Sequence, residues 1–220
     1  MCPRRREGEP GPTTADTMVE RLRARILGGE LPPSTPLREQ ELADDFGASR
    51  HTVRTALGRL TAEGLVQTVA YRGARVAELD DPQLLALQDL RGALESEAVR
   101  ILRDRHGDHW PAEVTAAMEE AIERLRGAER QGGWPGITRS HSAVHQALVA
   151  AAGSDRITQA YAQLDGEILL LLTHLRLDYP PGSLAIEHRD YLAAVQRDGA
   201  MAVRAHLAHS TELIRGGRAR

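Results

Sequence analysis

The sequence predicts a mainly α-helical protein, with a small N-terminal domain that ends in a β-hairpin and a C-terminal antiparallel all-α helical bundle. Three observations support this fold class. Apolar residues recur at helical spacing along most of the 220 residues, a short β-prone stretch interrupts them at residues 65–76, and the charge changes sign beyond it. Residues 1–76 carry 12 Arg against 10 acidic residues, whereas residues 77–220 carry 16 Arg against 21 acidic residues. The two parts are therefore expected to be separate domains with different partners.

The composition excludes several classes of protein. Hydrophobic residues make up 41% and charged residues 27%, which is typical of a folded chain. The single cysteine excludes an internal disulfide framework and a cysteine-based metal cluster. The densest apolar run, Ile168 to Leu172, is far shorter than the roughly 18 residues that a membrane span needs. Residues 1–16 lack the apolar segment of a secretory signal, so we expect a disordered arm on a cytoplasmic protein without a membrane partner.

Residues 17–79 are expected to form three helices and a hairpin. Met18, Leu22 and Ile26 recur at i, i+4 and i+8, which gives one apolar face to a first helix that ends near Gly28. The other expected elements are a short second helix marked by Leu37, Leu42 and Phe46, a third marked by Val53, Leu57 and Leu60, and strands at 65–69 and 74–76 around Tyr71, Arg72 and Gly73.

The third helix has a basic start. Ser49 is a good N-cap, and Arg50, His51, Thr52 and Arg54 follow it, largely on the side away from the apolar face. A short helix, a turn and a helix with an exposed basic N-terminus fit a helix-turn-helix, whose second helix enters the DNA major groove. Arg can donate two hydrogen bonds to guanine, and Arg72 at the hairpin tip could reach the DNA backbone or minor groove. The alternative interpretation is that these arginines form only a solvated face.

The same segment carries a family resemblance. Residues 18–79 contain G-E-L-P, L-R-E-x-x-L-A, F-G-x-S-R, V-R-x-A-L-x-R-L, E-G-L-V and R-G-A-x-V, and they resemble the winged helix-turn-helix of the GntR family of bacterial transcription regulators. The resemblance implies that Arg50 and Arg54 contact DNA, helped by Ser49, Thr52 and the wing at Gly73. Pro33 stands where the family usually has Gly, and His51-Thr52 replaces the common Thr-Pro, so the base preference stays open.

Residues from 82 onward are predicted to be helical throughout. Asp80 or Asp81 would cap the first helix, with Pro82 in its first turn. We expect six amphipathic helices with short connections, at about 82–105, 111–131, 136–152, 154–177, 183–198 and 200–214. Such a pattern is typical of an antiparallel bundle.

Eight of the nine histidines lie in this second part. His141 and His145 share a helix face at i, i+4, His188 lies on the fifth expected helix, and His206 and His209 lie on the sixth. Neutral imidazole commonly binds Zn²⁺ or Ni²⁺, so an interior divalent metal site is one interpretation. The other is that these are surface histidines or histidines hydrogen-bonded in the core.

A second resemblance covers about residues 83–213. The stretches 91–98, 141–154, 187–195 and 197–209 resemble the ligand-binding FCD domain of the FadR-like branch of the family. In that domain an Asp-x-x-x-His pair, a His after Glu and a His on the last helix commonly bind a divalent metal. The resemblance assigns these roles to His141, His145, His188 and His209, since His209 follows Asp198 by eleven residues as in the family. His141 stands where Asp is usual, which leaves open the metal and whether position 141 ligates.

The resemblance also implies that Arg91 faces an effector pocket, where it could pair with a small organic acid. The alternative for Arg91 is a surface salt bridge with Glu95, four residues along. The predicted function is a homodimeric, effector-controlled repressor that binds palindromic half-sites of double-stranded operator DNA and is not an enzyme. Two other classes stay open: a polyhistidine metalloenzyme joined to a DNA-binding module, and a DNA-binding dimer without an effector.

Overall fold

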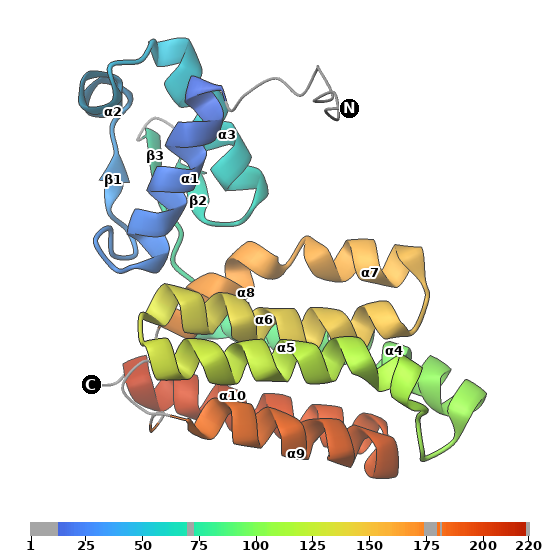
Figure 1. Ribbon diagram of the computed structural model, residues 1–220. Helices are drawn as coiled ribbons and strands as arrows, with labels where there is room; N and C mark the ends of the chain where they lie inside the picture. Colours follow the sequence, from blue (N-terminus) through green and yellow to red (C-terminus); the bar gives the residue numbers. More distant parts are fainter. Residues whose placement is uncertain (1–12, 70–72, 174–179, 181, 219–220) are drawn as a thin grey trace, which may run out of the picture. The chain divides into compact units, whose positions relative to one another are not determined.

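The computed structural model describes residues 13–69, 73–173, 180 and 182–218 (Figure 1). Two compact units make up the chain, one of Met1–Ile26 with Leu31–Ala77 and one of Leu27–Glu30 with Glu78–Arg220. The helical fold class with a winged helix-turn-helix and a helical C-terminal part is confirmed. In the described parts of the chain, no helix is both long and apolar enough to span a membrane.

The first helix of the N-terminal unit begins earlier than the sequence indicated. Most of the arm expected at residues 1–16 lies outside the described residues, but α1 spans Thr14–Leu27, so its first turn lies within the expected arm. The cause is a local cap that the sequence analysis missed. The Thr13 hydroxyl and the Asp16 carboxylate each accept a hydrogen bond from the other residue's backbone N–H, at 3.2 and 2.7 Å, and so satisfy two donors at the helix start.

The helix-turn-helix is formed by α2 (Glu39–Phe46) and α3 (Arg50–Ala62). Gly47 ends α2 in the left-handed conformation at φ 60°, which favours glycine, and the Ser49 side chain caps α3 by accepting from the Thr52 backbone N–H at 3.1 Å. Buried side chains of α1 and α3 build the core of this unit: Met18, Val19, Leu22, Ile26, Val53, Ala56, Leu57 and Leu60.

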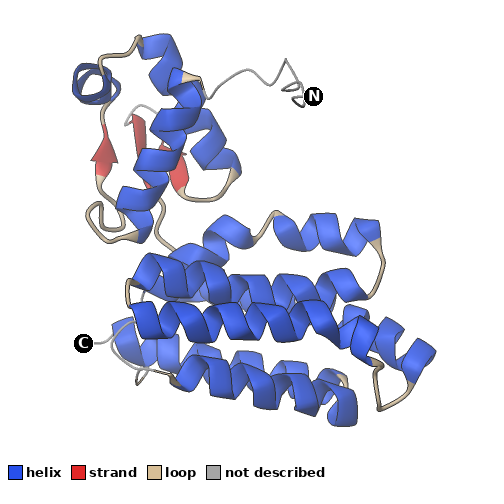
Figure 2. Cartoon of the chain, in the orientation of Figure 1, coloured by secondary structure: helices blue, strands red, loops and turns tan. Residues whose placement is uncertain are grey.

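A three-stranded antiparallel sheet completes the N-terminal unit, in the order β1-β3-β2 (Figure 2). The predicted hairpin is present as β2 (Val66–Val69) and β3 (Gly73–Val76). The sequence does not predict the third strand, β1 (Pro36–Leu37). Leu37 lies in this strand and not in the second helix, where the sequence places it. A strand of two residues is too short for a pattern of alternating apolar residues to predict it. Its residues are recognised as a strand only because they pair with Ala74 and Arg75 of β3.

In the part of the second unit that the structure describes, seven helices follow instead of six. They are α4 (Asp81–His106), α5 (Ala112–Gln131), α6 (Trp134–Ala151), α7 (Asp155–Ala162), α8 (Asp165–Leu172), α9 (Ser183–Asp198) and α10 (Ala200–Arg218). The expected fourth helix is divided into α7 and α8 at Gln163-Leu164, and its last expected residues, 174–177, lie outside the described residues. The Asp165 carboxylate at the start of α8 accepts hydrogen bonds from Ser142 and Gln146 of α6, a tertiary contact that the sequence does not reveal.

The core of the second unit is aliphatic at its ends and polar in its centre. Leu84, Val99, Leu102, Leu125 and Val195 are among its fully buried residues. Between them lie Arg91, Glu95, His145 and His188, each at most 2% exposed. Burial of so many polar side chains is costly unless they bind one another or a ligand, so this centre is where function is expected.

The cap of α4 makes a prediction about stability. The Asp80 carboxylate accepts from the Gln83 N–H at 2.8 Å, and the Gln83 side chain accepts from the Asp80 N–H at 2.9 Å. Asp80→Ala removes this capping box and should lower the free energy of unfolding by about 1 kcal/mol, measured by urea denaturation. Asp108→Ala, in an exposed loop, is the matched control, and an equal loss in both variants would contradict the role of the cap.

Candidate DNA-binding surface and buried histidine cluster

The start of α3 presents the predicted basic surface to solvent. Arg50, His51 and Arg54 are exposed, and Thr52 is half-buried because its N–H and hydroxyl bind Ser49. The buried residues of α3, such as Val53 and Leu57, lie on the opposite face. The N-terminal end of a helix also carries a partial positive charge, so side chains and backbone here favour a phosphate or a base edge.

Side chains of α2 hold the two arginines in place. The Arg54 Nε lies 2.8 and 2.9 Å from the two carboxylate oxygens of Glu39, and the Arg50 guanidinium donates to the Gln40 side-chain oxygen. The Arg54 guanidinium lowers the pKa of Glu39 by hydrogen bonding, and Glu39 in turn raises that of Arg54. Each guanidinium also has N–H groups that make none of these bonds. These free donors can bind DNA while the contacts with α2 hold the side chain in place.

The wing is described only in part. Gly73 is exposed and has φ 80°, a backbone conformation that glycine tolerates best, at the start of β3. Arg72, the other predicted contact on the wing, lies outside the described residues.

Three histidines meet in the centre of the second unit. His141 and His145 come from α6, and His188 comes from α9. Each residue offers one ring nitrogen, and these three nitrogens all lie within 4.8 Å of one another. All three are buried. The His141 Nδ1 is buried without a hydrogen-bond partner in the described part of the chain, which is unusual for a polar atom in a core.

Hydrogen bonds fix how two of these rings are protonated. The His145 Nδ1 lies 3.0 Å from the Glu95 carboxylate, and the His188 Nδ1 lies 2.8 Å from the Leu184 carbonyl oxygen. Both oxygens only accept, so both Nδ1 atoms carry hydrogen and each ring turns its Nε2 toward the other. These two Nε2 atoms face each other at 3.2 Å. A contact of this length is made either by a hydrogen on one of the two nitrogens, which donates to the other, or by a metal ion between them.

Burial keeps most of the cluster neutral. It lowers the pKa of His188 to about 3, and it lowers those of His141 and His206 well below their usual value, with the neighbouring histidines as further causes. Although burial opposes ionisation of Glu95, His145 and Arg91 hold the pKa of that carboxyl well below its ordinary range. Three neutral imidazoles beside an ionised carboxylate are suitable for binding a cation.

The structure corrects the fourth predicted ligand. His209 is exposed on α10, in a groove of about 510 Å³ between α9 and α10. His206, three residues earlier, faces inward, with its ring centroid 5.2 Å from His145 and 5.1 Å from His188. Matching the spacing after Asp198 chose the wrong residue, because residues three apart on a helix differ in direction by about 60°. Only packing of α10 against α9 decides which ring faces inward.

Arg91 and Glu95 form an ion pair, but a buried one rather than the surface pair that the sequence left open. The guanidinium lies 3.3 Å from the Glu95 carboxylate, and Nη1 donates to the Gln88 side-chain oxygen at 2.9 Å. At 2% exposure, Arg91 lies inside the unit, so its predicted effector contact requires a ligand that reaches the interior.

Glu95, which the sequence indicated only as a possible surface partner of Arg91, lies at the centre of the site. It is fully buried and accepts hydrogen bonds from Tyr161 at 2.7 Å and Tyr191 at 2.9 Å, besides contacting Arg91 and His145. A signal was present in the sequence, since Arg91 and Glu95 fall on the same helical stripe as buried Leu84, Ala98 and Leu102. Charged residues on an otherwise apolar stripe indicate a buried polar site.

Comparison with known families gives one match in each of the two units. Residues 14–76 match the model of bacterial regulatory proteins of the gntR family, and residues 86–212 match that of the FCD domain. Among curated proteins, the probable D-xylose utilization operon transcriptional repressor of Paenarthrobacter nicotinovorans is 28% identical over 184 residues, covering 84% of this chain and 79% of that protein. The Escherichia coli transcriptional repressor GlaR is 32% identical over 146 residues, covering 65% of each.

Solved structures agree on the fold. A GntR protein from Rhodococcus sp. RHA1 matches with a TM-score of 0.74 at 19% identity, covering 92% of this chain and 97% of that one. Escherichia coli McbR/YncC matches with a TM-score of 0.64 at 22% identity, covering 91% and 94%. The FCD match over more than half of the residues and the gntR match before it show that the chain belongs to the FadR-like branch of the GntR family of transcription regulators, which are not enzymes.

Proposed function

We propose that this protein is a cytoplasmic, homodimeric repressor that binds operator DNA through α3 and the wing, and that a divalent metal and a small carboxylate control it from the C-terminal unit. The observation that carries the proposed control by metal is the 3.2 Å approach of the His145 and His188 Nε2 atoms. Repression is the role that the relatives' names give those proteins, and similarity over the chain supports the same role here.

The DNA-binding proposal rests on exposure and charge. Ser49, Arg50, His51, Thr52 and Arg54 stand at the capped start of α3, with Gly73 on the wing and Arg72 beside it in the sequence. A homodimer would offer two such helices to the two half-sites of a palindrome.

The metal proposal rests on the nitrogen positions. Two imidazole ligands on a tetrahedral Zn²⁺ at about 2.0–2.1 Å are about 3.3 Å apart, which fits the 3.2 Å between the two Nε2 atoms. His141 and His206 are the nearest further rings to this pair, and the unpartnered His141 Nδ1 suits a ligand. His145 and His188 would hold the metal, with His141 and His206 completing its shell. The bound ion would supply a position at which a carboxylate could bind.

The carboxylate proposal rests on charge balance. Arg91 and Glu95 already neutralise each other, and burial keeps His141, His188 and His206 uncharged. A divalent cation among these residues would therefore bring two positive charges, of which the Glu187 carboxylate, 3.4 Å from the His206 Nδ1, could offset one. A small organic anion would restore the balance in a buried site. The groove between α9 and α10 reaches the outer edge of His206 and offers such a ligand a path.

The surface of α3 can be tested directly. Arg54→Ala should weaken specific operator binding by roughly 5- to 150-fold, because an Arg–guanine contact is worth about 1–3 kcal/mol. Fluorescence anisotropy with labelled operator measures this, and affinity should also fall steeply with salt. Arg124→Ala, an exposed arginine on α5, is the control. Equal operator affinity for Arg54→Ala and wild type would refute the assignment.

The ligand set can be tested by metal content. Purified without chelator, wild-type protein should contain about one Zn²⁺ or Ni²⁺ per chain by mass spectrometry. His145→Ala with His188→Ala should remove it and lower the Tm, because metal that binds only the folded state stabilises that state. His206→Ala should weaken binding, whereas His209→Ala should not. Metal-free wild-type protein that rejects added Zn²⁺ would disprove the site and favour a DNA-binding dimer without this cofactor.

The neutral histidines make a separate prediction for the metal-free protein. The pKa of His188 is about 3 in the folded protein, whereas an unfolded histidine has a pKa of about 6.5. Between these two pH values the unfolded state therefore binds more protons than the folded state. The free energy of unfolding should therefore be highest above pH 6.5. It should fall as the pH drops below that value, by up to about 1.4 kcal/mol per pH unit for each such histidine. Urea denaturation between pH 7.5 and 5 measures this above the range in which carboxylates titrate. His188→Gln should give a shallower slope, and an unchanged slope would count against a neutral His188.

A further inference from the structure

The first turn of α9, the helix that carries His188, has no capping side chain of its own. Its N-cap residue is Gly182, and the Ser183 hydroxyl donates to the Pro180 carbonyl oxygen at 2.7 Å instead of accepting from the helix. The first N–H groups of a helix have no partner within the helix, so their acceptors must come from elsewhere. The start of α9 therefore depends on another part of the chain.

Glu129, near the end of α5, supplies the missing acceptors. One of its carboxylate oxygens accepts from the Leu184 N–H at 3.0 Å, and the other accepts from the Ala185 N–H at 3.2 Å. The negative charge also suits the partial positive charge at the start of a helix. Glu120 and Glu123 of the same helix pair with arginines, whereas Glu129 has no ion-pair partner in the described parts of the chain. Its half-buried carboxylate thus binds the start of α9 alone.

A single peptide group connects this carboxylate with the histidine cluster. The amide between Leu184 and Ala185 donates its N–H to Glu129, and its carbonyl oxygen accepts from the His188 Nδ1 at 2.8 Å. Hydrogen bonds in such a chain polarise one another, so a carboxylate on the N–H side makes the carbonyl oxygen a stronger acceptor. The charge of Glu129 therefore acts on the His188 ring through one amide.

The two rings whose Nε2 atoms lie 3.2 Å apart thus each have a carboxylate behind them. Glu95 binds the His145 Nδ1 directly, whereas Glu129 reaches the His188 Nδ1 through the peptide group. An acceptor on the far nitrogen of an imidazole fixes its tautomer and orientation, and it raises the basicity of the nitrogen that faces a metal.

We propose that Glu129 is a positioning residue for His188, which it orients and strengthens as a metal ligand. Because its two oxygens bind two consecutive N–H groups, they restrict the rotation of α9 about its own axis, and His188 lies about one turn further along. A cap at position 182 would satisfy the same N–H groups without joining α9 to α5. The inference rests on the metal site of the proposed function and adds the residue that holds one of its ligands.

Binding of Co²⁺ to the whole chain, freed of metal with a chelator, tests the proposal. The visible absorption of Co²⁺ reports both its affinity and the geometry of its ligands. Glu129→Gln keeps the shape of the side chain but removes its charge and one acceptor. It should weaken Co²⁺ binding about tenfold, at the lower end of the range for groups that orient a metal ligand, and it should change the absorption spectrum.

Asp80→Ala is the matched control, because it removes the cap of a different helix, α4. This variant should lower the Tm but leave the affinity for Co²⁺ and the spectrum unchanged. Equal Co²⁺ affinity for Glu129→Gln and wild type, together with a lowered Tm, would show that Glu129 is only a helix cap.

A second measurement separates the role of Glu129 from the metal site itself. In metal-free protein with ¹⁵N-labelled histidine, the Nδ1–H proton signals of His188 and His145 report the strength of their hydrogen bonds. Glu129→Gln should shift the His188 signal upfield and leave that of His145, which binds Glu95, in place. An unmoved His188 signal would overturn the inference.

Wild-type protein that binds no Co²⁺ would disprove the proposed metal site, but an upfield shift of the His188 signal would still support the link from Glu129 to this ring. Circular dichroism shows whether each variant is folded. If Glu129→Gln is not, Glu129→Asp takes its place in both measurements. It keeps the charge but shortens the reach of the carboxylate, so both effects should have the same direction.

Discussion

The buried carboxylate of Glu95 is the interaction on which the centre of the C-terminal unit depends. It accepts hydrogen bonds from Arg91 on its own helix, His145 on α6, Tyr161 on α7 and Tyr191 on α9, so this one side chain connects four helices. A lone carboxylate at this depth would be strongly unfavourable, and these donors offset that cost. By binding the Nδ1 of His145, Glu95 also fixes the direction in which the Nε2 atom of that ring points, and with it the geometry of the histidine cluster.

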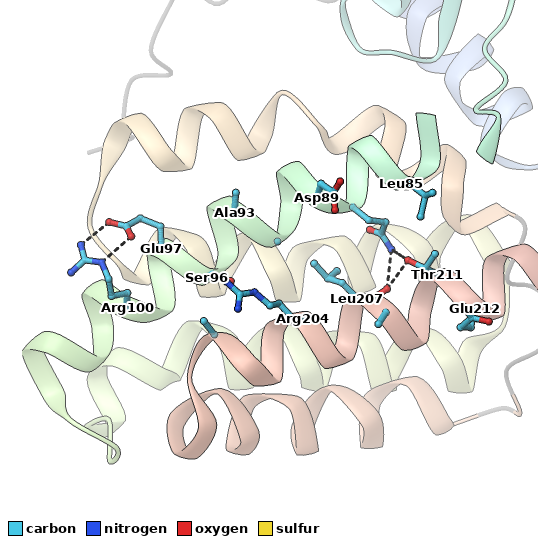
Figure 3. Close-up of a pocket in the computed structure, with 14 residues that line it drawn as sticks. Leu85, Asp89, Ala93, Ser96, Glu97, Arg100, Arg204, Leu207, Thr211 and Glu212 are labelled. Atoms are coloured by element: carbon cyan, nitrogen blue, oxygen red, sulfur yellow. Dashed lines mark hydrogen bonds and ion pairs between the residues drawn. The ribbon is translucent and has the colours of Figure 1, made fainter. Parts of the chain in front are cut away.

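The same polar centre reaches the surface of the unit through Gln88. Its side-chain oxygen accepts from Arg91, and its amide donates to Leu207 and Thr211 of α10, at the edge of a groove between α4 and α10 (Figure 3). A ligand that shifts Arg91 or Glu95 would therefore alter the hydrogen bonds that hold α10 against α4. Coupling of this kind is limited by how differently the ligand binds the two arrangements.

His141 gives this chain a site that differs in charge from the pattern its sequence resembles. Where the resemblance expects an aspartate, an imidazole with a buried, unpartnered nitrogen stands 4.4 Å from the His188 ring. Neutral ligands bind a dication with less charge compensation than a carboxylate does, so an anionic effector would contribute more to the stability of the occupied site. In the proposed site, the exchange of this one side chain would make metal binding depend more strongly on the effector.

The sequence by itself determined the elements and the division of the chain, because periodicity, caps and glycines act locally. The Ser49 and Asp80 caps, the stop at Gly47, the hairpin and most of the helices of the bundle follow from such signals. The exposure of Arg50 and Arg54 followed as well, since the apolar face of α3 leaves them no other side. Only the tertiary structure shows that β1 pairs with β3, that the expected fourth helix breaks at Gln163-Leu164, that His206 rather than His209 faces inward, and that Glu95 joins four helices. Each of these depends on contacts between segments distant in the chain, and helical spacing cannot show which neighbour a side chain will meet.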